Sequence, residues 1–183
     1  MHSLKIKIEI QAELSKDGKI IKRYPWKKAN SLLKGFIQAL AAQMSDISQT
    51  ITDTGNIGRA SAKSLYNLTC NAGAGATTFG LLIGTNSTPV IMTDYKLGTP
   101  VTTNIAHGNV TFAVENPDAN TWRLAIARTF TNNTGSALGV EEAALYTYFS
   151  ASQYIICIDR TLYQVSVGAG VTLTLTYRIT ATL

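Results

Sequence analysis

Two segments near the ends of the chain alternate apolar and polar residues with a period of two. Residues 171–182 place one set of side chains on one side, with Thr and Arg178 between them: Val171, Leu173, Leu175, Tyr177, Ile179 and Ala181. Residues 4–14 alternate in the same way, with Ile6, Ile8 and Ile10 between charged or polar residues. Successive side chains of a strand point to opposite faces of a sheet. The pattern therefore predicts two long strands, each with one buried face.

The chain from residue 64 onward is predicted to consist of strands and turns. Gly-, Asn- and Pro-rich turn signals separate candidate strands at 64–70, 78–84, 108–115, 121–131, 138–147, 153–159, 161–167 and 171–182. This spacing is typical of an antiparallel β-sandwich or jelly roll. Alternation in the two longest strands predicts a core that contains Trp122, Leu124, Phe130, Leu173, Leu175 and Tyr177.

The N-terminal part is predicted to form a β-hairpin and one α-helix. Asp17-Gly18 is a strong hairpin signal between strands over 4–14 and 20–24. A helix over 31–44, with Asn30 as its N-cap, would have an apolar face of Leu32, Leu33, Phe36, Ile37, Leu40 and Met44. We expect this face to cover Ile6, Ile8 and Ile10 of the hairpin. The predicted division is a hairpin–helix anchor unit (1–44), a loop or linker (45–63) and a sandwich domain (64–183).

Positive charge is concentrated at the N-terminal end. The first 34 residues contain nine Lys or Arg against three acidic residues and carry +6, whereas the whole chain carries +5. Seven residues are candidate partner-anchoring residues: Lys5, Lys7, Lys22, Arg23, Trp26, Lys27 and Lys28. Such a cluster can dock on an acidic protein, and phosphates with base stacking on Trp26 are the less favoured alternative. A solvated face, or a strand edge protected by lysines, is the structural alternative.

The residues that could carry catalysis are few. His2 and His107 are the two histidines, and the chain has neither an HExxH nor a GxSxG motif. The glycine-rich stretch 71–80 (NAGAGATTFG) lacks the Gly-Lys-Ser/Thr of a phosphate-binding loop, so we expect a flexible loop or tight turn. No catalytic, metal or cofactor site is predicted, and no small-molecule substrate is expected.

Three further polar or reactive features have structural interpretations. Arg128 lies among apolar residues of its predicted strand, and we expect a buried ion pair with Glu141, or with Glu142. Cys70 and Cys157 lie in apolar runs and are predicted to be buried thiols rather than a disulfide. No apolar run reaches the ~18 residues of a membrane span, and no signal peptide is visible, so we expect synthesis in the cytosol and no membrane partner.

Two pairs of motifs resemble patterns of virion structural proteins of tailed phages. Residues 82–89 (LIGTNSTP) and 92–97 (MTDYKL) resemble a "GTG…TP…DY.L" segment. Residues 128–136 (RTFTNNTGS) and 140–146 (VEEAALY) resemble the companion "F.N.(S/T)G…V.E.GLY" segment, although Ala144 stands where that pattern has Gly. The stretch 29–36 and the closing strand 168–183 are similar to further elements of these proteins.

The resemblance implies a non-enzymatic structural role in a virus particle. It implies a capsid or capsid-associated (decoration) subunit, with head-fibre and tail components as further possibilities. The expected partners are copies of the same chain, as a trimer or larger homo-oligomer, and other virion proteins. The expected location is the virion of a bacteriophage, after synthesis in the host cytoplasm.

A receptor- or carbohydrate-binding module of a phage fibre or tail is the alternative function. It would need exposed aromatic side chains on one set of loops, and the candidates are Tyr146, Tyr148, Phe149 and Tyr154. The favoured interpretation of these aromatics is that they fill the core or an oligomer interface. The low charged fraction of 15% and the Thr-lined strand faces favour a protein that packs against its own copies.

Overall fold

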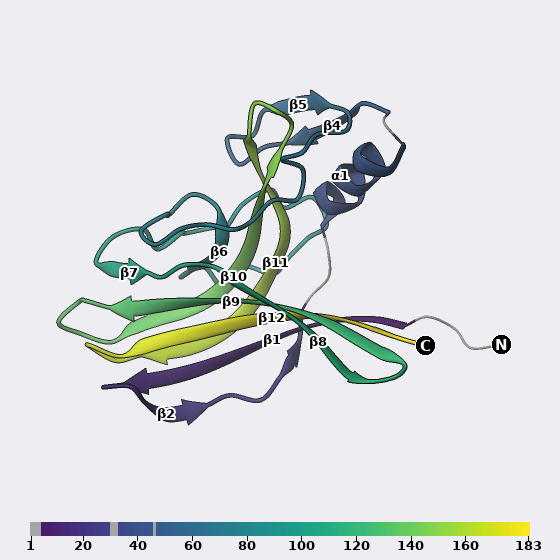
Figure 1. The fold of residues 1–183 in the computed structure, drawn as a ribbon. Helices are drawn as coiled ribbons and strands as arrows, with labels where there is room; N and C mark the ends of the chain where they lie inside the picture. The colour runs from purple at the N-terminus through teal and green to yellow at the C-terminus, as the bar shows by residue number, and fades with distance from the viewer. Residues whose placement is uncertain (1–4, 30–32, 46) are drawn as a thin grey trace.

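The computed structural model describes residues 5–29, 33–45 and 47–183. It is mainly β, with antiparallel sheets and one helix, so the predicted fold class is confirmed (Figure 1). The larger sheet has the strand order β2-β1-β12-β9-β7, with β3 paired to β1 and β8 paired to β9. Its strands are β1 (Lys5–Lys16), β2 (Lys19–Arg23), β3 (Lys27–Lys28), β7 (Ile105–His107), β8 (Thr111–Asp118), β9 (Thr121–Asn132) and β12 (Thr172–Thr182).

A second sheet covers one face of the larger sheet and closes the core. It has the order β11-β10-β6 and contains β6 (Gly80–Gly84), β10 (Leu138–Phe149) and β11 (Tyr154–Val167). Figure 1 shows β10 and β11 crossing the larger sheet and continuing to the helix and to the small hairpin of β4 (Gln49–Thr52) and β5 (Gly58–Ser61). Side chains of both sheets form the main hydrophobic cluster, among them Ile10, Leu81, Phe149 and Leu175.

The helix α1 (Lys34–Ser45) packs on β4 (Gln49–Thr52) and β11. Its buried residues are Ala39 and Ala42, whereas Ile37 and Met44 of the predicted apolar face are exposed. Small residues allow close contact at this interface: a Cβ on Gly35 would lie 3.1 Å from the carbonyl oxygen of Cys157. The predicted residues Asn30 and Leu32 lie outside the described part of the chain.

The predicted separate hairpin–helix unit is wrong. β1 pairs with β12 along its length, from Lys5 opposite Thr182 to Ser15 opposite Thr172, so the N-terminal strand belongs to the sandwich. A long strand completes its backbone hydrogen bonds by pairing with another long strand, which a short helix cannot offer, and side chains of the second sheet then help to bury its apolar face. The β1–β2 turn itself is as predicted, with Asp17 and Gly18 at φ values of 51° and 75°.

Three other boundaries differ from the predictions. The expected loop 45–63 contains a hairpin of β4 and β5 (Gly58–Ser61). The expected strand 64–70 does not form, because residues 65–68 make a turn in which Leu68 has a φ of 65°. The two strands expected at 153–159 and 161–167 are one continuous strand, β11.

The predicted core is correct at one end of the larger sheet and wrong at the other. Phe130, Leu173, Leu175 and Tyr177 are buried as predicted. Leu124 is half-buried, and Trp122 is 57% exposed. The side chains of β12 alternate as expected, with Leu173, Leu175 and Tyr177 buried and Thr residues on the other face. The burial of the apolar face therefore decreases along the strands, from Phe130 and Leu173 at one end to Trp122 at the other.

Candidate interaction surfaces

The seven predicted anchoring residues lie along one margin of the larger sheet instead of forming one cluster. Lys5 lies at the start of β1, whereas Arg23 of β2 pairs with Glu13, eight positions further along that strand. At about 3.4 Å per residue the two ends are roughly 27 Å apart. The β2 strand is exposed throughout, so its Lys19, Lys22 and Arg23 protect a sheet edge.

Most of these basic residues have partners within the chain. Lys7 contacts Glu9 at 2.7 Å and Arg23 contacts Glu13 at 2.6 Å. Lys22 and Lys27 lie over the rings of Tyr24 and Tyr163, and Trp26 lies under the guanidinium of Arg178 at 3.9 Å. Acidic and aromatic neighbours therefore reduce the positive field along this margin, and a docking role for the whole set stays a prediction.

The expected ion pair of Arg128 with Glu141 or Glu142 does not exist. Arg128 is buried, and its guanidinium donates hydrogen bonds to the backbone carbonyls of Gly73, Ala76, Phe79, Leu81 and Gly108. Four of these carbonyls belong to the stretch 71–81, so the glycine-rich loop folds around this cation. Backbone carbonyl oxygens of this loop thus take the place of the Glu141 or Glu142 carboxylate that was expected to pair with Arg128. Burial lowers the pKa of Arg128.

Glu142 instead binds Arg160 and a long loop. Its carboxylate accepts a hydrogen bond from Arg160 Nε at 2.6 Å and others from the backbone N–H groups of Gly98 and Thr99. Arg160 also binds Asp94 at 2.8 Å and donates to the carbonyl of Thr88. This network attaches the connection 85–104 to the second sheet.

The four aromatic candidates for ligand binding do not form an exposed set. Tyr146 and Phe149 are buried, and the Tyr146 hydroxyl accepts a hydrogen bond from the backbone N–H of Leu97. Tyr148 stacks on Phe79 with ring centroids 4.4 Å apart, and Tyr154 lies under Arg59. These contacts favour the interpretation that the aromatics fill the molecule.

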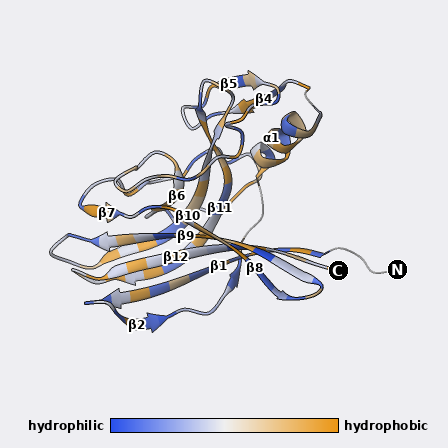
Figure 2. Ribbon diagram, in the orientation of Figure 1, coloured by the Kyte–Doolittle hydropathy of each residue, from blue (hydrophilic) through white to orange (hydrophobic). Residues whose placement is uncertain are grey.

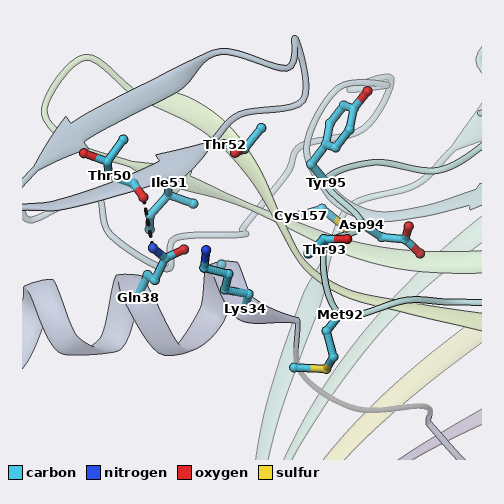
Figure 3. A pocket seen from close by; sticks show the side chains of 11 residues that line it. Lys34, Gln38, Thr50, Ile51, Thr52, Met92, Thr93, Asp94, Tyr95 and Cys157 are labelled. Carbon is cyan, nitrogen blue, oxygen red and sulfur yellow. Dashed lines mark hydrogen bonds between the residues drawn. The ribbon is translucent and has the colours of Figure 1, made fainter.

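A small pocket lies between α1, β4 and the loop around residues 92–95 (Figure 3). Its volume is about 100 Å³, and its lining includes Lys34, Asp94 and Cys157. Gln38 donates to the carbonyl of Thr50 at 3.0 Å across its margin. Burial raises the pKa of the Cys157 thiol well above its usual range, so the reactive thiolate is disfavoured.

Both cysteines are buried free thiols, as predicted. His107 is buried against the ring of Phe130. Burial, and to a smaller extent the nearby charge of Arg128, lowers the pKa of His107.

Among the described residues, no group of three or more His, Cys, Asp or Glu side chains could hold a metal ion. Within that same part of the chain, no helix is long and apolar enough to cross a membrane.

The most distinctive exposed surface is the end of the larger sheet that the second sheet does not cover. The inner face runs in rows across the strands, and the row Ile10–Tyr177–Ile126 is buried. The next two rows continue the same apolar face but emerge from the core. We call this surface the apolar overhang; it consists of Ile6, Ile8, Val114, Trp122, Leu124, Ile179 and Ala181.

Three side chains of the apolar overhang are exposed to solvent, and the other four are half-buried. Ile6 is 66%, Trp122 57% and Val114 71% exposed. A shallow hollow of about 260 Å³ lies between Val114, Trp122, Leu124, Ile179 and Ala181, with Arg123 at its margin. Figure 2 shows hydrophobic and hydrophilic residues alternating along β9, β12 and β1, up to the end where the C-terminus lies.

Sequence reasoning missed the apolar overhang. The alternation of Ile6, Ile8 and Ile10 was visible, but it assigns a face and says nothing about how far the covering sheet extends. Trp122 and Val114 were therefore expected to lie in the core or in an ordinary strand. Comparisons of the chain with protein-family models, with curated proteins and with solved structures found no match.

Proposed function

We propose that this chain is a non-enzymatic structural subunit of a tailed-phage particle, a capsid or capsid-associated (decoration) protein that assembles with its own copies. The observation that carries the proposal is the apolar overhang, a sheet face that spans four strands and that no other described part of the chain covers. Contiguous exposed apolar surface on a folded protein is typical of a contact with another macromolecule.

The physical argument is the cost of leaving this face in water. Burying apolar surface contributes about 25 cal/mol per Å², so half-exposed side chains such as Trp122 and Ile6 keep a substantial gain unused in the isolated chain. A subunit that works in an assembly can recover that gain at the contact. A monomer that worked alone would be expected to carry polar residues at these positions.

The loop network supports the same proposal through the resemblance to virion proteins. The two resembling segments are far apart in sequence, yet Asp94 of one and Glu142 of the other bind the same buried Arg160. The Tyr146 hydroxyl adds a direct contact to Leu97. The similar residues therefore hold a long connection against the second sheet, which is the kind of rigid scaffold that a particle subunit needs.

A receptor- or carbohydrate-binding module remains the alternative, and no observation favours it. Its four candidate aromatics pack within the chain instead of lining one exposed site. Binding to a glycan array by the purified protein would be the result that favours it over assembly.

The test is the location of the protein in particles. Particles released from cells that carry the gene are banded in a caesium chloride gradient and probed with an antibody against the purified protein. We expect the protein in the particle band, and gold label at a regular position on the particles in micrographs. Recovery of the protein only in the particle-free fraction would contradict the proposal.

A further inference from the structure

The apolar overhang has two margins, the edge of β1 and the edge of β8. We propose that the β8 margin of one copy of the chain binds the β1 margin of another copy. The exposed edge of β8 in one copy adds to the first residues of β1 in the next copy, so that the larger sheet continues across the contact. This inference deepens the proposed function and rests on it, because it names a second copy of the chain as the partner and strand pairing as the contact.

Among the described residues, both margins are open strand edges. On one side, β2 pairs with β1 at residues 13–16 and β3 pairs with residues 9 and 10, and the Ala29 N–H donates to the carbonyl of Ile8. Among the described residues, no strand pairs with residues 5–7 on this side. On the opposite side, β9 is the one strand of the described ranges that pairs with β8, and the residues of β8 are exposed apart from the half-buried Glu115. An unpaired edge is a ready template for another strand.

The strand directions allow the sheet to continue without rearrangement. β1 is antiparallel to β12, β12 to β9, and β9 to β8. A second copy in the same orientation therefore places its β1 antiparallel to β8 of the first copy. The apolar faces of the two overhangs then lie on the same side of the extended sheet, as the alternation of side chains requires.

The charges at the two margins are opposite, and they lie in the same rows. One row runs from Lys7 through Thr180 and Arg123 to Glu115. The neighbouring row runs from Lys5 through Thr182 and Thr121 to Asp118. Addition of β8 to β1 of another copy brings the acidic ends of these rows to the basic ends.

Opposite charges across neighbouring strands stabilise pairing, and like charges oppose it. Contact of two β1 margins or of two β8 margins is therefore disfavoured, which makes the contact head-to-tail. Ion pairs within the chain leave the charged side chains of both margins accessible. The side chain of Lys7 is 62% exposed although it contacts Glu9, and that of Glu115 is 40% exposed although it lies 3.8 Å from Arg178.

A head-to-tail contact forms a closed ring when the rotation between copies closes. We expect such a ring to hold three or more copies, each with its β8 margin on the β1 margin of the next copy. The apolar faces of the overhangs then turn toward the ring axis and cover one another. The contact thus removes both the open edges and the exposed apolar surface.

A zero-length carbodiimide cross-link on the unmodified protein tests the contact. Isotope-labelled and unlabelled protein are mixed and allowed to exchange subunits, and linked peptides are identified by mass spectrometry. We expect mixed-isotope links from Lys5 or Lys7 to Glu115 or Asp118. Within one chain the two margins are three strand spacings apart, about 14 Å, which is too far for such a link. Absence of these mixed links from an oligomeric sample overturns the inference.

Charge reversal gives an independent test with its own control. The variants Lys5→Glu/Lys7→Glu and Glu115→Lys/Asp118→Lys should each sediment at the monomer mass, because like charges then meet at the contact. A mixture of the two variants should recover the oligomer, because each reversed margin again finds its complement. Circular dichroism and thermal unfolding check that each variant is folded.

Oligomers that persist in both reversed variants overturn the inference. So does a mixture of folded monomeric variants that stays monomeric. If the wild type is oligomeric and bound to particles but these tests fail, the edge contact is wrong and the proposed function stands. Absence of the protein from particles contradicts the proposed function itself.

Discussion

Arg128 carries a buried positive charge whose hydrogen-bonding partners are all backbone carbonyls. None of the ion pairs among the described residues includes it. Its five hydrogen bonds join β9 to the glycine-rich loop, to the start of β6 and to Gly108. A single side chain thus sets the conformation of a loop that has little apolar surface of its own to bury.

Replacing Arg128 by Met should therefore be costly. The substitution keeps an apolar stem but leaves several buried carbonyls without a donor, and each buried unsatisfied group costs about 1–3 kcal/mol. We expect a loss of about 3 kcal/mol or more in the free energy of unfolding, measured by urea titration. The control is Arg23→Ala, whose surface ion pair with Glu13 should matter by about 1 kcal/mol at most. Equal, small losses for both variants would contradict this account of the loop.

His107 should make the stability of the fold depend on pH. Burial and then the Arg128 charge lower its pKa from the usual 6.5, and a weaker backbone contact with Val101 acts in the opposite direction. The unfolded chain therefore binds a proton more readily than the folded chain does. The resulting stability is fully present above pH 6.5 and is lost as the pH falls toward the lowered folded value.

The variant His107→Leu removes the titrating group from this site. Urea unfolding between pH 7.5 and 5 should show a smaller decrease in the free energy of unfolding for the variant than for the wild type. An unchanged decrease would mean that other groups cause the pH dependence.

At the scale of elements, β1 crosses the boundary between the core and the apolar overhang. Ile10 and Ile6 have the same side chain, lie on the same face of this strand and are four residues apart, yet Ile10 is fully buried and Ile6 is mostly exposed. Ile10→Ala should cost about 2–5 kcal/mol, as for buried Ile side chains generally. Ile6→Ala should change the free energy of unfolding of the monomer by less than about 1 kcal/mol. Similar losses at both positions would show that the second sheet extends over the overhang.

The Glu142–Arg160–Asp94 network should hold the connection 85–104 in place. Glu142→Ala leaves the buried Arg160 guanidinium without one of its carboxylates, and breaking a buried ion pair costs about 3–5 kcal/mol. We expect this loss in urea unfolding and faster tryptic cleavage after Lys96 in the loosened loop. Glu13→Ala, which breaks a surface ion pair, is the control. Cleavage after Lys96 at the wild-type rate would contradict the proposed attachment.

The sequence predicts those elements whose signal is local. The alternation of β1 and β12, the Asp17-Gly18 turn and the turn before β12 are encoded by neighbouring residues, and the structure has them where expected. The partner of each element is not encoded locally. The apolar face of β1 was expected to pack on the helix, but β1 pairs with β12, more than 150 residues away. The same limit explains Arg128 and Glu142, most of whose partners lie in loops that have no periodic pattern.

A periodic pattern also cannot predict how far the second sheet extends over the larger sheet. Val114, Trp122 and Ile6 follow the rule for inward-facing residues and do face inward, but the second sheet ends before it reaches them. The candidate anchoring residues were expected in a separate basic unit, and their position along a sheet margin and their contacts with acids and aromatic rings depend on the folded sheet. The apolar overhang thus became visible only when the two layers were seen together.

At the scale of the whole molecule, the account depends on whether the apolar overhang is covered in solution. The most direct measurement is the mass of the wild type and of Trp122→Glu by sedimentation equilibrium over a range of concentrations. The account predicts three or more chains of 19.7 kDa for the wild type, and a folded 19.7 kDa monomer for the variant, because a carboxylate then lies in the apolar contact. A wild type that stays at 19.7 kDa at every concentration would contradict it.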